Sequence, residues 1–269
     1  MTQVVRSSFQ NHPFHLVSPS PWPMYTSISL FSLASSGALS MHSFSAGYNI
    51  FYLALALVVF SMSFWFRDII TEETFLGNHT GAVQKGLNLG VILFIVSEAL
   101  FFMAIFWAFF HSALTPTVEL AGAWPPLGIT PVNPFELPLL NTVILLSSGA
   151  TITYAHHSLI SGERQGALYG TIATVLLAII FTCFQGVEYS LSSFTISDGI
   201  FGTCFYFSTG FHGLAILIGT IFIGTALWRI YRYHLTDNHH LGFEASILYI
   251  YFVDVVWLFL YVSVYYWGS

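Results

Sequence analysis

The chain has 269 residues, of which 55% are hydrophobic and 7% are charged. A soluble domain carries about 25% charged residues, so this chain cannot cover a globule of its size with ionic surface, and lipid is its expected solvent. The formal charge of −6 comes from twelve acidic and six basic residues without a run of either sign, which argues against a nucleic-acid partner.

Apolar stretches of hydrocarbon length recur along the chain, and about seven of them approach the ~20 helical residues that cross a bilayer. All ten prolines lie in the N-terminal segment or between Pro116 and Pro138, outside the interiors of these stretches. We therefore expect an all-α integral membrane protein, folded as a single polytopic membrane domain over residues 1–269. Its seven transmembrane helices are predicted at approximately 24–41, 48–66, 82–111, 137–157, 164–189, 199–231 and 241–267.

Small residues mark two candidate sites of close helix packing. Gly86 and Gly90 form a GxxxG motif on the third helix, and Gly166 and Gly170 form another on the fifth. Close backbone approach at small residues drives helix association in lipid. We expect these motifs to pack helices within the chain rather than to form a dimer.

The basic residues predict the orientation, because Lys and Arg gather on the side from which a membrane chain inserts. With seven spans, all six bases fall on the N-terminal side: Arg6, Arg67, Lys85, Arg164, Arg229 and Arg232. The N-terminus is thus expected inside, which is the matrix for a mitochondrial protein, and the C-terminus outside.

Three ionisable residues are expected deep in the membrane: Glu98, His212 and Asp254. At 1.5 Å of rise per residue they lie about 25, 28 and 20 Å from the inner helix ends, so we hypothesise a hydrogen-bonded intramembrane polar cluster. In one interpretation Glu98 exchanges protons or gates them. In the other, the three groups are neutral, paired and structural.

The eleven histidines do not predict a haem or copper site. A redox centre within the membrane requires several deep imidazoles on facing helices. Only His212 lies at depth, and most of the others lie at or near the inner face. We expect no catalytic residue and no metal bound by this chain.

Mixed charges at the inner face predict a lipid-binding edge. Arg67, Glu72 and His79 lie in one connection, and Arg229, Arg232 and His234 lie in another. Such a mixture suits lipid phosphates together with ethanolamine groups. An ordinary solvated membrane edge is the alternative interpretation.

Many sequence motifs, in order along the whole chain, resemble those of cytochrome c oxidase subunit III. They include HPFHLV, SPWP, FRDI, TFLGNHT, AVQKG, SEALFF, FWAFFHS, WPPLGI, PLLNT, AHHS, FTISDG, TGFHG, NHHLGFEA and VDVVWLFLYVSVYYWGS. One departure is Ala215, at a position where the family often has a second histidine after TGFHG.

The resemblance implies seven helices arranged as two plus five around a lipid-filled cleft, without a redox centre. It implies a core subunit of respiratory complex IV in the mitochondrial inner membrane. Its expected partners are catalytic subunit I, which with other subunits holds haem a and copper, the remaining complex IV subunits and a respiratory supercomplex.

The resemblance also implies roles for single residues. Glu98 in SEALFF matches the family's intramembrane glutamate, near a lipid-lined oxygen path and linked to sustained proton uptake. Glu72, His79, Arg229 and Arg232 match positions that contact bound phospholipids. The expected lipids are cardiolipin, phosphatidylglycerol or phosphatidylethanolamine.

The sequence therefore predicts an accessory subunit that stabilises the catalytic subunit and supports its proton-pumping turnover. One alternative is a stand-alone proton-coupled carrier that uses Glu98, although the internal repeats and broken helices of many carriers are not seen. Another is an assembly subunit without influence on oxygen or protons.

Overall fold

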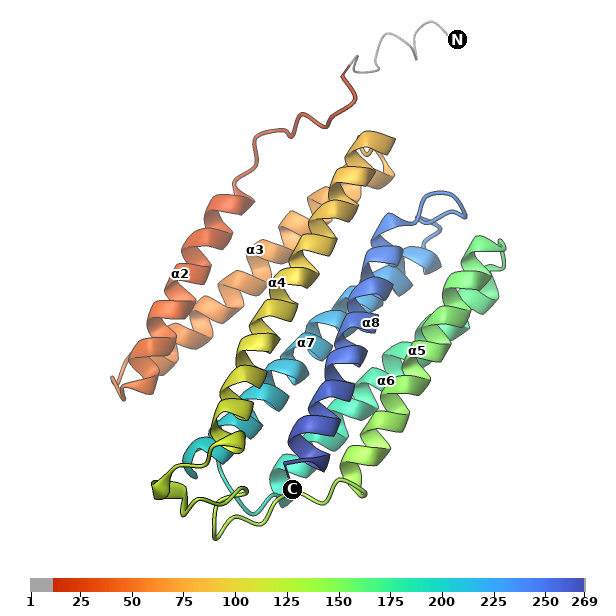
Figure 1. Ribbon diagram of the computed structural model, residues 1–269. Helices are drawn as coiled ribbons and strands as arrows, with labels where there is room; N and C mark the ends of the chain where they lie inside the picture. The colour runs from red at the N-terminus through yellow and green to blue at the C-terminus, as the bar shows by residue number, and fades with distance from the viewer. Residues whose placement is uncertain (1–11, 269) are drawn as a thin grey trace, which may run out of the picture. The chain divides into compact units, whose positions relative to one another are not determined.

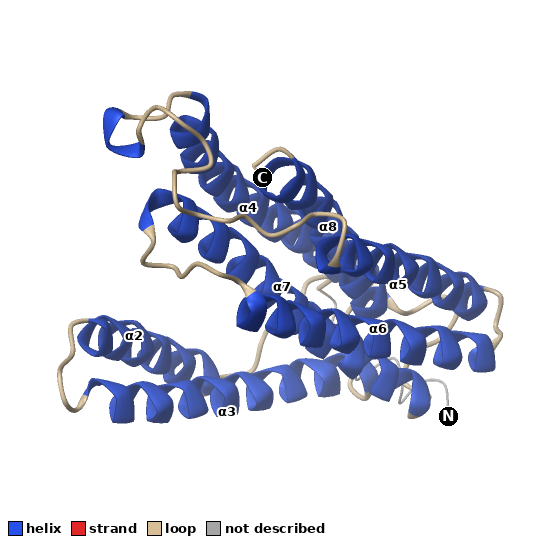
Figure 2. Ribbon diagram, turned by 90° about the horizontal axis from the view of Figure 1, so that it is seen from below, coloured by secondary structure: helices blue, strands red, loops and turns tan. Residues whose placement is uncertain are grey.

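The computed structural model describes residues 12–268, and the described chain is helical with no strand (Figures 1 and 2). Arg6, which contributes to the predicted orientation, lies outside the described residues. The long helices are α2 (Trp22–Met41), α3 (Gly47–Thr74), α4 (Gly81–Leu114), α5 (Leu137–Ile160), α6 (Arg164–Leu191), α7 (Gly199–Tyr231) and α8 (Leu241–Leu260). A 3-10 turn, η1 (Val118–Leu120), and a π-helical end, η2 (Tyr261–Tyr266), complete them.

Six of these helices are long and apolar enough to cross a membrane, and α2 is the long helix that is not among them. The reason lies in its serines, which lower its apolar character. Several serine hydroxyls donate to carbonyls of the same helix, as Ser29 does to Tyr25 and Ser32 to Ile28. Such internal hydrogen bonds reduce the cost of placing a hydroxyl in an apolar environment.

Helix α3 differs most from its predicted bounds, since it continues past Phe66 to Thr74. The predicted bounds left residues 67–81 as a connection, which is wrong, because the segment between helices α3 and α4 is only 75–80. An apolar run ends where the hydrocarbon ends, but a helix continues as long as its backbone remains hydrogen-bonded. The Thr71 hydroxyl adds a bond to the Arg67 carbonyl in this polar extension.

The chain divides into two compact units, Met1–Leu87 and Asn88–Ser269. In the first unit α2 packs along α3 through a tight turn. A methyl group at Gly47 would lie 2.6 Å from the Ser40 backbone nitrogen, so the turn requires glycine. The Trp22 ring stacks on Phe64 with 5.0 Å between centroids, and the Thr26 hydroxyl donates to Ser61.

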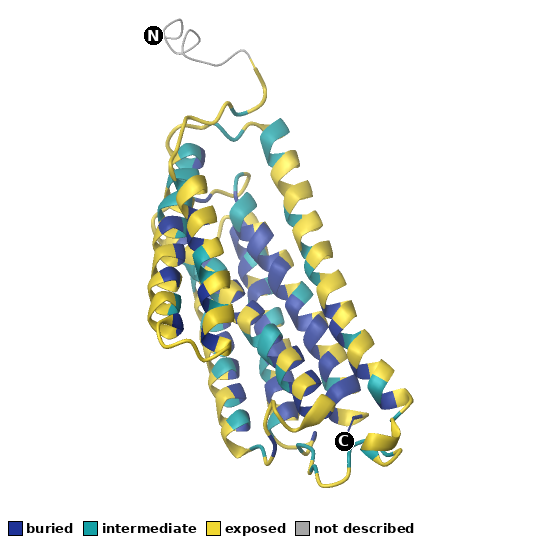
Figure 3. Cartoon of the chain, turned by 90° about the vertical axis from the view of Figure 1, so that its left-hand side faces the viewer, coloured by how far each residue is buried: buried dark blue, intermediate teal, exposed yellow. Residues whose placement is uncertain are grey.

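The second unit contains two buried clusters of apolar side chains. One includes Phe181, Phe205 and Trp257, and the other includes Ile152 and Phe243. Buried positions follow one side of many helices, while exposed positions follow the other (Figure 3). The packing leaves much apolar surface facing outward, as expected for helices surrounded by lipid.

Gly166 and Gly170 pack α6 closely against α5, as the GxxxG motif predicts. A methyl group at Gly170 would lie 2.9 Å from both the Ala155 Cβ and the Thr151 carbonyl oxygen. By contrast, a methyl group at Gly86 or Gly90 would meet no described atom within 4 Å. Gly86 and Gly90 thus make no close helix contact with the described residues of their own units.

Candidate functional site

The middle of α8 meets two of the predicted intramembrane polar residues. The Tyr249 hydroxyl donates to Glu98 Oε1 on α4 at 3.4 Å. One turn further along α8, the Val253 carbonyl lies 3.2 Å from His212 Nε2 on α7. Because a carbonyl oxygen only accepts, His212 carries its proton on Nε2 in this contact. The imidazole is fully buried.

Asp254, the third predicted residue, follows Val253 directly and lines a small cavity of about 10 Å³. Ser148, Thr174 and Thr220 line the same cavity, which has room for about one water molecule. Asp254 Oδ2 would lie 3.1 Å from a methyl group added at Gly149, so the carboxyl group packs directly on α5.

Glu98 and His212 both contact α8, which carries Asp254, but each of the three residues has its own contact. Glu98 meets a hydroxyl, His212 a backbone carbonyl and Asp254 the cavity. Among the described residues, the hydrogen bonds do not join any two of these three side chains. The three residues are therefore linked through helix α8 and not by hydrogen bonds between their side chains.

The predicted lipid-binding residues of the first unit lie along the polar extension of α3 and the connection after it. Arg67 forms a 2.8 Å ion pair with Asp68, whose other oxygen accepts from the Trp22 indole at 2.7 Å. Glu72 Oε2 lies 3.9 Å from His15 Nδ1. The His15 ring in turn lies edge-on to that of His79, 6.1 Å away. These contacts form two groups, Arg67 with Asp68 and Trp22, and Glu72 with His15 and His79.

The predicted lipid-binding residues of the second unit gather where α7 ends. Arg229 is 5% exposed and its guanidinium packs on α8, 2.9 Å from a methyl group placed at Gly242. The His234 backbone N–H donates to the Arg229 carbonyl at 2.9 Å, and the His234 ring lies edge-on to Trp228. Burial, reinforced by Arg229 and Arg232, holds the pKa of His234 below its usual value. His234 is thus neutral at pH 7, which leaves the positive charge of this cluster on its two arginines.

Arg164 stabilises the same helix end from the neighbouring helix. Its Nε and NH2 groups donate to the carbonyls of Ile230 and Tyr231 at 3.2 and 2.7 Å. Its guanidinium also stacks over the Tyr233 ring, 3.7 Å from the centroid. A cation near the carbonyl end of a helix satisfies unpaired acceptors and opposes the negative end of the helix dipole.

A buried polar network at the other end of α6 was not predicted from the sequence. Glu188 is 1% exposed, and its Oε1 accepts from the Tyr265 hydroxyl at 2.6 Å and from Gln185 at 3.0 Å. Gln185 also accepts from the Asn141 amide at 3.4 Å. The spacing of Gln185 and Glu188 by three residues, on one face of an otherwise apolar helix, is the signal that could have revealed it.

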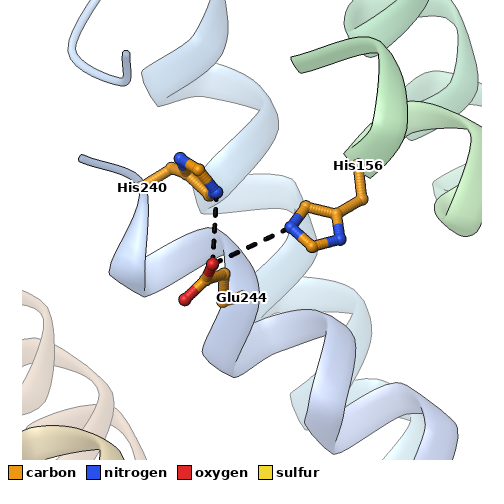
Figure 4. A group of neighbouring side chains, drawn as sticks. All are labelled: His156, His240 and Glu244. Carbon is orange, nitrogen blue, oxygen red and sulfur yellow. Dashed lines mark ion pairs between the residues drawn. The ribbon is translucent and has the colours of Figure 1, made fainter. Parts of the chain in front are cut away.

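A second unpredicted group joins the end of α5 to the start of α8, as Figure 4 shows. Glu244 Oε1 lies 3.2 Å from His240 Nε2 and 3.9 Å from His156 Nε2. The sequence placed both histidines near the inner face but gave no reason to expect them side by side. More than eighty residues separate them in the sequence, and at this separation the spacing of two residues does not predict whether they are in contact.

Comparisons with known proteins agree over the whole chain. The family model of cytochrome c oxidase subunit III matches residues 12–269. Relatives named cytochrome c oxidase subunit 3 from Podospora anserina, Pyricularia grisea and Neurospora crassa are 77%, 78% and 76% identical over 269 residues. Each alignment covers 100% of this chain and 100% of the relative.

Proposed function

This chain belongs to the cytochrome c oxidase subunit III family, and from that premise we propose that it stabilises the catalytic subunit and prolongs its turnover without a redox centre of its own. It is a multi-pass membrane subunit of complex IV, which transfers electrons from cytochrome c to dioxygen. The proposal concerns what this subunit adds to that oxidoreductase.

The observation that carries the proposal is the large apolar surface that the chain does not bury itself. In the apolar 18-residue core of α4 only 11% of positions are buried within the chain, against 56% in that of the helix formed by α8 and η2, Leu241–Tyr266. Apolar helix faces of this size are stable only against lipid or other membrane helices. We assign these faces to lipid and to catalytic subunit I, with the remaining complex IV subunits and a supercomplex as further partners.

The environment of His212 supports the proposal that haem a and copper belong to partner subunits. His212 is the one deep histidine of the predicted spans, and its ring packs against those of Phe181 and Trp257, with centroids 5.7 and 5.0 Å away. Its Nε2 carries the proton directed at the Val253 carbonyl. That nitrogen is therefore not presented to a haem iron or a copper ion.

Phospholipids are the proposed ligands of the two sets of polar residues predicted at the inner face. Arg67, Glu72 and His79 form one, and Arg229, Arg232 and His234 form the other. Arginine pairs with phosphate oxygens, while a carboxylate such as Glu72 pairs with an ethanolamine group. This chemistry suits cardiolipin, phosphatidylglycerol or phosphatidylethanolamine.

We further propose a single polytopic domain of seven spans, arranged as two plus five around a lipid-filled cleft, in the mitochondrial inner membrane. The internally bonded serine hydroxyls of α2 support its assignment as the seventh span. The distribution of Lys and Arg supports an N-terminus in the matrix and a C-terminus in the intermembrane space.

Turnover-dependent inactivation tests the proposal. Oxidase purified with and without this chain would be compared for initial rate and for the number of turnovers before activity is lost. We expect similar initial rates but a shorter lifetime without the chain. Equal lifetimes would refute the supporting role and favour a purely structural assembly subunit.

Glu98→Gln tests the proposed part of Glu98 in this support. The amide keeps the size of the side chain but cannot exchange a proton, so we expect a shortened lifetime with normal assembly. Glu119→Gln is the matched control, because Glu119 is an exposed glutamate in a connection outside the spans. A Glu98→Gln oxidase with the lifetime of the control would show that proton exchange at Glu98 is not needed.

A further inference from the structure

We propose that His156, His240 and Glu244 form a binding site for a divalent ion of the zinc class, where α5 ends and α8 begins (Figure 4). The inference goes beyond the proposed function and does not depend on it. It departs from the expectation that this chain binds no metal, and it concerns an ion without redox chemistry.

The ligand set and its dimensions suit such an ion. One ligand atom from each residue lies within 4.8 Å of the other two. Two atoms that each lie about 2.1 Å from a tetrahedral ion are about 3.4 Å apart. The pair of His240 Nε2 and Glu244 Oε1, at 3.2 Å, already has this separation. His156 Nε2 lies 3.9 Å from the same oxygen, so a small movement of one side chain closes the site.

The structure orients His240 as metal-ligating histidines are oriented. Its Nδ1 lies 2.9 Å from the Thr236 carbonyl, an acceptor that requires the proton to be on Nδ1. The lone pair of a neutral ring is then on Nε2, the atom directed at Glu244. A second hydrogen bond that fixes the tautomer is a regular companion of metal ligation by histidine.

The backbone and an aromatic ring hold the other two ligands. Glu244 lies one helical turn after His240, and its N–H donates to the His240 carbonyl at 3.1 Å, so both side chains project from the first turn of α8. The His156 ring packs edge-on against Phe243 at 6.1 Å. Ordered ligands of this kind lose little conformational entropy when an ion binds.

Both Nε2 atoms lack a hydrogen-bond partner among the described residues, although they are shielded from solvent. Buried imidazole nitrogens normally have a partner, so two that face the same carboxylate need an explanation. A bound cation would satisfy both at once. The Glu244 side chain is 45% exposed, which gives an ion access and leaves a coordination position for water.

Two imidazoles and one carboxylate also define which ions bind. Nitrogen-rich sites favour Zn²⁺ and similar transition ions, whereas Mg²⁺ prefers oxygen ligands. Zn²⁺ is therefore the probe, and a site of this class is expected to ignore millimolar Mg²⁺.

The test uses the intact oxidase after dialysis against a chelator. Zn²⁺ binding would be titrated in competition with a chromophoric chelator for wild type, His156→Ala, Glu244→Gln and the control His157→Ala. His157 is the neighbouring exposed histidine and lies outside the group. We expect wild type and His157→Ala to bind one Zn²⁺ more tightly than the other two variants, by at least about tenfold.

Zinc-edge X-ray absorption supplies a second measurement that does not depend on activity. The wild-type site should show two imidazole ligands and an oxygen near 2.0–2.1 Å, and His156→Ala should lose one imidazole. Glu244→Gln conserves the shape of the side chain, which keeps the test valid if an alanine variant fails to assemble. Equal Zn²⁺ affinity in all four oxidases, or an equal loss in His157→Ala, would overturn the proposal in favour of a simple histidine–glutamate ion pair.

Discussion

The contact between Tyr249 and Glu98 allows the role of Glu98 to be measured as a coupling between two side chains. Tyr249→Phe removes the donor hydroxyl, while the ring keeps its stacking on Phe94 at 6.1 Å. At 3.4 Å the hydrogen bond is long, so we expect the net contribution of about 0.5–1.5 kcal/mol that is typical of neutral hydrogen bonds. Since 1.4 kcal/mol corresponds to a factor of ten, Tyr249→Phe should increase the inactivation rate by about two- to tenfold.

A double-mutant cycle with Glu98→Ala separates this coupling from other effects of each substitution. Oxygen consumption would be followed to exhaustion of activity for wild type, both single variants and the double variant. Because the hydroxyl acts through the carboxyl group, the double variant should be inactivated no faster than Glu98→Ala alone. If instead the two rate increases multiply, the side chains act independently, and α8 does not transmit the effect of Glu98.

Three further substitutions test packing and charge. Gly170→Leu should reduce assembly of the oxidase on immunoblots of the purified complex, because overpacking costs about 1–3 kcal/mol of stability. Gly186→Leu on the same helix is the control, since an added Cβ there meets no described atom within 4 Å, and equal losses would contradict the close α5–α6 contact. Phe181→Ala removes a fully buried ring and should reduce the free energy of unfolding by about 3–5 kcal/mol, which lowers the calorimetric transition temperature of the complex. Ile179→Ala, at an exposed position, should leave the transition temperature near that of wild type. The lowered pKa of His234 means that the unfolded chain binds more protons than the folded chain, so the free energy of unfolding should fall as the pH drops below about 6.5. The thermal transition temperature, measured between pH 8 and pH 5, should therefore depend less on pH in His234→Asn than in wild type. The same pH dependence in both proteins would refute this.

The sequence predicts the helices well because each span must satisfy its backbone within itself and present apolar side chains to lipid. That constraint acts on short stretches of sequence, so it can be read locally. The polar end of α3 shows where it fails. Arg67 and Thr74 lie on one continuous helix, although the apolar run has ended by Phe66.

The candidate sites are less predictable, because their contacts join helices that are distant in the sequence. Depth along a helix identifies Glu98 as an unusual residue, but its partner Tyr249 follows 151 residues later. The same limitation hides the group formed by His156 and Glu244. Glu188 was not predicted for a different reason. The predicted helix ends at residue 189, which places Glu188 at the membrane–water interface, where an ionisable side chain is ordinary.

Family membership resolves the choice between a respiratory subunit and a stand-alone carrier, which the intramembrane carboxyl groups alone leave open. Carboxyl groups at depth are common to both classes. What separates them is a match that extends along residues 12–269 rather than any single residue.

Arg164 has a consequence for how this protein tolerates change. Its positive charge contributes to the predicted membrane topology. Its planar guanidinium also caps the C-terminal end of α7 by donating to the carbonyls of Ile230 and Tyr231. Lysine would preserve the charge that directs insertion but could not reproduce the paired, stacked geometry. Arg164→Lys would thus leave the chain correctly inserted while the last turn of α7, which carries Arg229 and is followed by Arg232, frays.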